Sequence, residues 1–371
     1  MGTSDRKMMT YLIRRLIMGS GLLLLFSGLY GGLVRIGLFS IHVFDSVFLH
    51  HGAIMVGGFL GTLIGFERAV ALEINWPYLT PISCVLGSFW IVGGFEPFWG
   101  SVLITIGSMI MVAIFAYITW KQPTDHAFLL TVGAICWVVG NGFWLYGWRI
   151  QELVYWWMGF LILTIVAERL ELNRLMTIEG LKRWTYMLAF FGFPAGLLVR
   201  IWDVPVGMII AGGSLISMAV WLLTFDVARR TIWQKGEQAY SGWGMFIGYL
   251  WLVVAGVLFV VFPEQTGGFY YDAILHSVFV GFVFSMIFGH SLIIFPTVIG
   301  RSIPFTGWLY LPLVLLHASL VLRIGGDLSH WMSGRLWGGV LNVSAIVLFF
   351  LIMGSVVGFA EASGGESSAR S

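Results

Sequence analysis

Long apolar segments recur along the whole chain and leave little room between them for a water-soluble domain. Each has about the twenty residues that an α-helix needs to cross a lipid bilayer. Charged residues make up only 10% of the 371 residues, against about 25% in a soluble domain. The segments lie near residues 16–38, 44–70, 77–95, 98–120, 126–148, 152–171, 184–202, 204–226, 243–262, 272–299, 306–324 and 334–359. We therefore expect an all-α polytopic membrane protein of about twelve transmembrane helices, with residues 1–371 forming a single integral membrane domain.

Lys and Arg residues fall unevenly on the two sides of the predicted membrane. Placing the N-terminus inside puts 15 of the 20 on the inner side. The outer five are Arg35, Arg149, Arg200, Arg323 and Arg335. Because positively charged loops stay on the cytoplasmic side, this bias predicts that both termini are cytoplasmic.

Charge and motifs argue against several classes of function. The net charge of +2 provides no basic surface for nucleic acid. The two cysteines, Cys84 and Cys136, lie in apolar segments, and no CxxC pair exists for a thiolate zinc, iron–sulfur or covalent haem site. No P-loop, GxSxG or HExxH motif supports nucleotide-driven transport, serine hydrolysis or zinc proteolysis.

Histidine inside the predicted membrane is the feature that needs a chemical explanation. An ionisable group is costly in hydrocarbon unless it has a partner, so its presence there favours a functional role. Five of the eight histidines lie within predicted spans, namely His50, His51, His276, His290 and His317. The other three are expected in loops or at the membrane boundary, namely His42, His126 and His330.

The positions of these histidines predict haem or metal ligands. His276 and His290 are fourteen residues apart, which places both imidazoles on one stripe of a helix, separated by about 21 Å. His51 is expected at the depth of His276, and His317 near the depth of His290. Because b-type haem takes one imidazole from each of two facing helices, we expect His51 and His276 to form an axial pair. His290 and His317 are candidates for a second haem or for copper, with His50 as a further metal ligand.

Other polar residues leave two interpretations open. Arg35 and Arg323 are candidates to bind haem propionates, and contact with lipid headgroups explains them equally. The histidines have an alternative in hydrogen bonds between helices. The pairs Glu67–Arg68 and Glu168–Arg169 are expected to be local ion pairs, with proton uptake as the alternative, and Asn141 and Asn342 are expected to form interhelical hydrogen bonds.

Two segments of the sequence combine histidine with small residues. The first is HHGAIMVGGFLGTLIGFER followed by NWP. The second combines His276, Met286, Gly289–His290 and Gly300–Arg301 in the tenth predicted helix and the loop after it. Both segments resemble the NnrS family of bacterial membrane proteins, and the first is similar to the His-led, Gly-rich second helix of that family.

The resemblance implies a haem- and copper-binding protein of the bacterial inner membrane that acts in the response to nitric oxide. Haem b, one or two per chain, is the expected cofactor, with copper as an addition. Expected partners are the lipid bilayer, nitric oxide or quinol, and a membrane or periplasmic redox partner. Whether the protein is an enzyme, such as an oxidoreductase, is left open. The alternatives are a quinol-linked electron-transfer subunit similar to cytochrome b and a proton-coupled secondary transporter that uses the histidines and Glu67.

Overall fold

Every regular element in the described part of the chain is a helix. The computed structural model describes residues 3–39, 45–172, 181–299 and 303–368, and no strand occurs within these ranges. The all-α prediction is therefore confirmed for the described residues. Two features singled out from the sequence, His42 and the Gly300–Arg301 pair, lie outside them.

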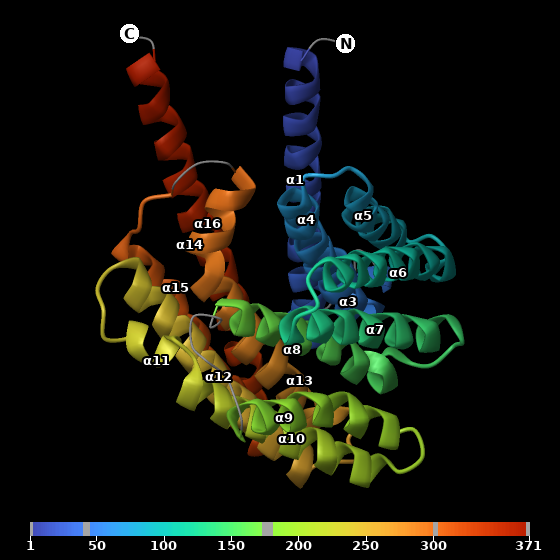
Figure 1. The fold of residues 1–371 in the computed structure, drawn as a ribbon. Coiled ribbons are helices and arrows are strands. Elements are labelled where there is room, and N and C mark those ends of the chain that lie inside the picture. Colours follow the sequence, from blue (N-terminus) through green and yellow to red (C-terminus); the bar gives the residue numbers. More distant parts are fainter. Residues whose placement is uncertain (1–2, 40–44, 173–180, 300–302, 369–371) are drawn as a thin grey trace. The chain divides into compact units, whose positions relative to one another are not determined.

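The chain divides into two compact units, Met1–Ala167 and Glu168–Ser371, with the boundary inside one helix. The first unit contains α1 (Thr3–Arg35), α2 (Asp45–Leu49), α3 (His51–Ala53), the π-helical segment η1 (Ile54–Leu60), α4 (Gly61–Leu72), the 3₁₀ turn η2 (Trp76–Tyr78), α5 (Leu79–Val92), α6 (Pro97–Lys121), α7 (Asp125–Leu145) and most of α8 (Ile150–Leu172) (Figure 1). The second unit begins with the end of α8. It continues with α9 (Leu181–Val199), α10 (Val204–Phe225), α11 (Ala228–Thr231), α12 (Glu237–Val261), α13 (Gly268–His276), the π-helical segment η4 (Ser277–Phe284), α14 (Ser285–Ile299), the 3₁₀ turn η5 (Gly307–Leu309), α15 (Tyr310–Leu328) and α16 (Met332–Ser368).

Small residues let the helices of the first unit approach closely. α1 packs against α3, η1 and α4, while α5 packs on α6 and α6 on α7. A Cβ atom at Gly61 would lie 2.6 Å from the ring of Trp137 on α7, and one at Gly87 would lie 2.6 Å from the backbone oxygen of Gly100 on α6. Trp137 also stacks on Phe160 of α8, with ring centroids 4.4 Å apart. Close approach through small residues is how membrane helices associate without a hydrophobic driving force.

The second unit is built in the same way. α9 lies beside α10, α10 packs on α12, and α15 packs along α16 (Figure 1). A Cβ atom at Gly196 would lie 2.5 Å from the backbone nitrogen of Ala211 on α10, and one at Gly212 would lie 2.7 Å from the backbone oxygen of Gly256 on α12. α12 also contacts η4 and α14, which places the tenth predicted span against the ninth.

Ten helices in the described ranges are long and apolar enough to cross a membrane, so the chain is a multi-pass membrane protein. Two of the twelve spans expected from the sequence are not among the ten. The segment near 77–95 becomes α5, whose 14 residues are about 21 Å long and therefore shorter than a hydrocarbon core of about 30 Å. The segment near 184–202 becomes α9, in which Lys182 and Arg183 occupy the first turn. The count of twelve and the side on which the termini lie stay predictions.

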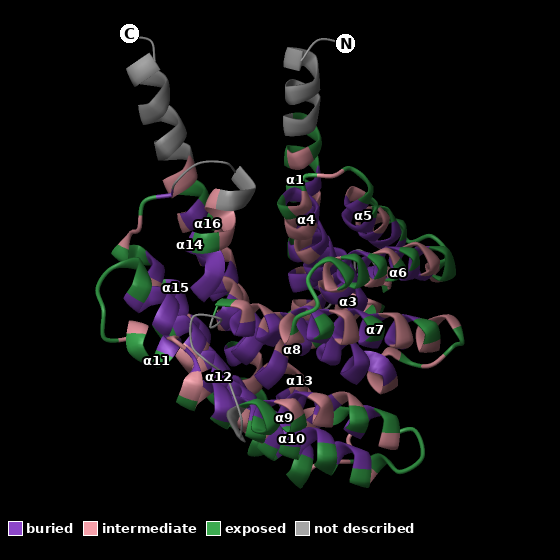
Figure 2. Ribbon diagram, viewed as in Figure 1, coloured by how far each residue is buried: buried purple, intermediate pink, exposed green. Residues whose placement is uncertain are grey.

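Three spans are more deeply buried than the others. In an 18-residue window the buried share is 83% for Ile150–Leu172, 78% for His51–Leu72 and 72% for Gly268–Pro296 (Figure 2). The last two are also the spans that contain the π-helical segments η1 and η4. Because π-helical turns are rare and are frequently found at functional sites, these two spans are where a site is expected.

Candidate functional site

His51 lies at the start of the buried second span, and α1 holds its ring. The Nδ1 atom is 2.6 Å from the backbone oxygen of Gly28. A carbonyl oxygen only accepts, so Nδ1 carries the proton and Nε2 carries the lone pair. A Cβ atom at Gly32 would lie 3.1 Å from Cε1 of the ring. Glycine at this position therefore makes room for the imidazole on the surface of α1.

His276 ends α13 and is fixed in the same tautomer. Its Nδ1 atom lies 2.9 Å from the backbone oxygen of Asp272 and 3.4 Å from Oδ1 of the same residue. Both oxygens accept, so the proton is on Nδ1 and the lone pair is on Nε2. A histidine whose Nδ1–H is held by a carbonyl or carboxylate is the usual form of a metal ligand, because the second hydrogen bond orients the ring and raises its basicity.

Asp272 belongs to a cluster of charged side chains, the Asp272 cluster, which also contains His276, Arg323, Asp327 and Arg335. Arg323 donates to Asp272 twice, from Nε at 2.9 Å and from Nη2 at 3.1 Å. Arg335 lies between the two carboxylates, 3.4 Å from Asp272 and 3.3 Å from Asp327. The side chain of Asp327 is 0% exposed. With neutral His276 the two carboxylates and two guanidinium groups balance, which is the condition for burying so many charges together.

The two spans with π-helical segments share a local arrangement. Each has a histidine with an anchored Nδ1 followed by the π-helical segment, and a small residue occurs at every fourth position from within that segment onward. In the second span the small residues are Gly57, Gly61 and Gly65, and in the tenth they are Gly281, Ser285 and Gly289. A Cβ atom at Gly57 or Gly281 would lie 2.9 or 2.5 Å from a neighbouring side chain. These faces therefore carry close helix contacts in each unit.

His290 lies further along the tenth span and has protein partners at both ring nitrogens. Nδ1 is 2.8 Å from the backbone oxygen of Met286, and Nε2 is 3.1 Å from Nη1 of Arg169. Arg169 in turn donates to Asp226 from Nε at 3.1 Å and from Nη2 at 2.9 Å. The side chains of Arg169 and Asp226 are 2% and 0% exposed. His290 thus completes a buried ion pair that links the end of α8 to α14 and the α10–α11 junction.

His317 on α15 also has both ring nitrogens engaged. Nε1 of Trp251 donates to Nδ1 at 3.1 Å, and Nε2 lies 3.3 Å from Oγ of Ser285. Ser285 donates its own proton to the backbone oxygen of Gly244 at 2.6 Å, so it accepts from Nε2–H. His290 and His317 are each satisfied by protein groups. Their geometry favours the hydrogen-bonding alternative, and a second haem or copper site on them stays a prediction.

Gly281 controls the approach of Trp251, the donor to His317. Gly281→Ala would place a Cβ atom 2.5 Å from Cγ of Trp251, so we expect a loss of about 1 to 3 kcal/mol in the free energy of unfolding. Gly213→Ala is the matched control, because no heavy atom lies within 4 Å of the added methyl group and Ala is the better helix former. Detergent unfolding followed by tryptophan fluorescence checks both, and equal midpoints for the two variants would contradict the packing argument.

The remaining sequence candidates have simpler surroundings. Arg35 donates to the backbone oxygen of Phe48 at 3.5 Å and lies over its ring. His50 is anchored through Nδ1 to the backbone oxygen of Ser46 at 3.0 Å. Glu67 forms the expected local pair with Arg68 at 3.7 Å. These contacts leave the metal role of His50 and the propionate role of Arg35 as predictions.

The interhelical role predicted for the two asparagines is confirmed. Asn141 donates to Ser108 of α6 at 3.0 Å and accepts from Trp157 of α8 at 2.9 Å. Asn342 of α16 donates to Ser319 of α15 at 2.6 Å. Both are buried, so each fixes one helix against its neighbours through polar contacts.

One family model, described as Domain of unknown function (DUF8744), matches residues 14–357. The chain belongs to the DUF8744 family. The match covers both compact units of this DUF8744 protein and all ten candidate spans in whole or in part. No curated protein matches the chain significantly.

The DUF8744 chain holds no cluster of three or more His, Cys, Asp or Glu side chains with metal-binding geometry among its described residues. Cys84 and Cys136 are buried free thiols.

Four residues of the DUF8744 chain that shape these sites were not singled out as candidates from the sequence. Asp226, Asp272 and Asp327 look like ordinary span-end acids, and Arg335 looks like a solvated outer cation. The sequence offered one signal, the acids at residues 226 and 272. An acid within or beside a predicted span indicates that the carboxylate has a buried partner.

Proposed function

We propose that this DUF8744 protein is a membrane haem protein in which His51 and His276 each supply an axial nitrogen to b-type haem. The observation that carries the proposal is their shared setting. Both rings have Nδ1 anchored on a backbone oxygen, both lie in strongly buried spans, and both precede a π-helical segment. Such anchoring fixes the tautomer in which Nε2 carries the lone pair, which is the form in which a histidine binds iron.

In such a site the protein would orient the two histidine rings and exclude water from the haem. When bound, haem supplies an iron that exchanges electrons or binds a small gas. Gly28 and Asp272 fix the rings through their backbone oxygens. The carboxylate of Asp272, 3.4 Å from Nδ1 of His276, would help to hold that imidazole in the orientation of an iron ligand. Arg323 and Arg335 pair with this carboxylate at 2.9 and 3.4 Å.

Within this proposal, a role in the response to nitric oxide is favoured by the resemblance to the NnrS family in the second and tenth spans. An electron-transfer role between quinol and an external partner is the alternative. The nitric oxide role requires an iron with an open coordination position for the gas, whereas the electron-transfer role does not. The bacterial inner membrane is the expected location in both cases.

A reduced-minus-oxidised absorption spectrum of the detergent-purified protein tests the proposal, with haem counted per chain before and after addition of nitric oxide. We expect b-type bands from one or two haems per chain. Bands that shift with nitric oxide support the NnrS-like role, whereas bands that ignore it support electron transfer. A purified, monodisperse protein that holds no haem after expression with added haem precursor would overturn the proposal.

A proton-coupled transporter is the second candidate function, and the Asp272 cluster is the observation that favours it. Buried acids and bases within spans are typical of proton pathways. The haem-free outcome of the spectrum would make this function the leading one. Proton uptake into vesicles, compared between unchanged protein and Asp327→Asn, would then be the measurement.

A further inference from the structure

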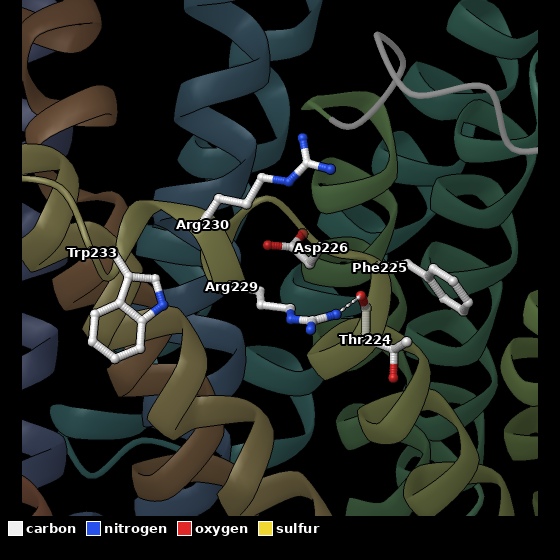
Figure 3. Close-up of a pocket in the computed structure, with 6 residues that line it drawn as sticks. All are labelled: Thr224, Phe225, Asp226, Arg229, Arg230 and Trp233. Atoms are coloured by element: carbon white, nitrogen blue, oxygen red, sulfur yellow. Dashed lines mark hydrogen bonds between the residues drawn. The ribbon is translucent and has the colours of Figure 1, made fainter.

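The chain turns sharply where α10 leaves its span, and this turn forms a pocket. Asp226 and Val227 separate the last residue of α10 from the short helix α11. The pocket has a volume of about 460 Å³ and is lined by Thr224, Phe225, Asp226, Arg229, Arg230 and Trp233 (Figure 3). Figure 3 shows the side chain of Arg229 reaching toward Thr224 at the end of α10, while the side chain of Arg230 extends on the other side of Asp226 in this view.

The carboxylate of Asp226, which lines this pocket, is already paired with Arg169. The Asp226 carboxylate receives two hydrogen bonds from Arg169 and a third from the backbone N–H of Ala228 at 2.7 Å. Arg229 and Arg230 are exposed. Arg229 makes one long hydrogen bond, at 3.4 Å, to the backbone oxygen of Thr224. Within the part of the chain that the structure describes, no salt bridge joins Arg229 or Arg230 to a carboxylate, so the pocket presents two positive charges.

The shape and position of the pocket select the ligand. A guanidinium group is a planar fork of donors that matches the oxygens of a phosphate. The pocket lies directly beyond Phe225, the last residue of a 22-residue span, and so at the depth of lipid headgroups. The indole of Trp233 is 81% exposed, and exposed Trp beside a span is typical of the membrane interface. Basic pockets at such positions bind anionic headgroups.

We propose that this pocket binds the phosphate of an anionic phospholipid headgroup, held by Arg229 and Arg230 and flanked by Trp233. The site is independent of the proposed haem, because no predicted haem ligand lines it. The lipid is expected to sit against the turn that carries Asp226. An occupied pocket would thereby hold the α10–α11 turn closed over the buried Arg169–Asp226 pair.

Native mass spectrometry of the full-length detergent-purified protein, titrated with phosphatidylglycerol or phosphatidylcholine, tests the site. We expect retained phosphatidylglycerol on the unchanged protein, and an affinity lower by roughly tenfold to thirtyfold in the double variant Arg229→Gln/Arg230→Gln. Arg149→Gln is the matched control, since Arg149 is an exposed arginine at another span end, outside the pocket. Equal retention by the double variant and the control would overturn the proposal.

Two further arms separate lipid from other ligands. Inorganic phosphate and glycerol phosphate are titrated as competitors, and displacement of the lipid by either at equal concentration would assign the pocket to a soluble phosphate and overturn the lipid source. If the protein retained phosphatidylcholine as well as it retains phosphatidylglycerol, selection of an anionic headgroup by the two arginines would be contradicted. If the double variant does not purify as a monodisperse protein, Arg230→Gln alone is used, because Arg230 lies outside the Arg229–Thr224 hydrogen bond.

Discussion

Asp226→Ala is expected to lower the free energy of unfolding by about 3 to 5 kcal/mol, the usual cost of removing one partner of a buried ion pair. Arg169 is 2% exposed and donates to both carboxylate oxygens of Asp226. The substitution would therefore leave a buried guanidinium group beside His290 and Tyr249 without its carboxylate partner. The backbone N–H of Ala228 would lose its acceptor as well. Unfolding in mixed micelles with increasing dodecyl sulfate measures the effect.

A double-mutant cycle separates the loss of the pair from the exposure of an unpaired charge. Arg169→Met combined with Asp226→Leu is expected to unfold much closer to the unchanged protein than Asp226→Ala does, because an apolar pair of similar volume removes both charges. Glu152→Ala, which removes the partner of the exposed Arg149, is the surface control and is expected to unfold near the unchanged protein. An equal cost for Asp226→Ala in the presence and absence of Arg169 would show that the pair is not coupled.

The membrane class of the fold was predictable from the sequence because each span carries its own evidence. Hydrophobicity and length identify a helix within one segment, and all ten candidate spans coincide with predicted ones. The prediction differs from the structure where a helix is near the minimum length for crossing a membrane. α5 is apolar but only 14 residues long, and the apolar stretch counted for it ran on into the residues after the helix.

The partners of the buried charges were not predictable in the same way. Arg169 and Asp226 are 57 positions apart, and Arg323 and Asp272 are 51 positions apart. No local periodicity encodes such pairs, because they depend on which helices pack together. The expectation that Arg169 would pair with the adjacent acid treated a long-range contact as a local one. The role of the two asparagines was easier to predict. A lone amide inside a span needs a hydrogen-bonding partner on a neighbouring helix, and this holds whichever helix that is.

The π-helical segments were also outside the reach of pattern reasoning. A π-helical turn changes the angle per residue, so a stripe calculated at 3.6 residues per turn drifts across it. The expected alignment of His276 and His290 on one stripe assumed an α-helix throughout, whereas Ser277–Phe284 lies between them and is π-helical. That change in register is one reason why the two histidines have such different surroundings.

His276→Ala is expected to abolish or halve the haem content of the purified protein, depending on whether one or two haems bind. The ring offers an Nε2 lone pair because Asp272 holds the proton on Nδ1, and alanine has no ligand atom. The fold is expected to persist, since Arg323 and Arg335 still pair with Asp272 when the imidazole is gone. Haem per chain and the elution volume of the protein are measured on the same preparation.

Two histidine controls make this result specific. His126→Ala is expected to keep the full haem content, because His126 lies at the start of α7 and its ring contacts Thr124 in the same turn. His290→Ala is expected to keep haem but to lose about 1 to 3 kcal/mol of stability, because Arg169 loses a buried acceptor. Haem loss in His290→Ala with unchanged stability would instead assign His290 to the cofactor, and unchanged haem in His276→Ala would remove His276 from it.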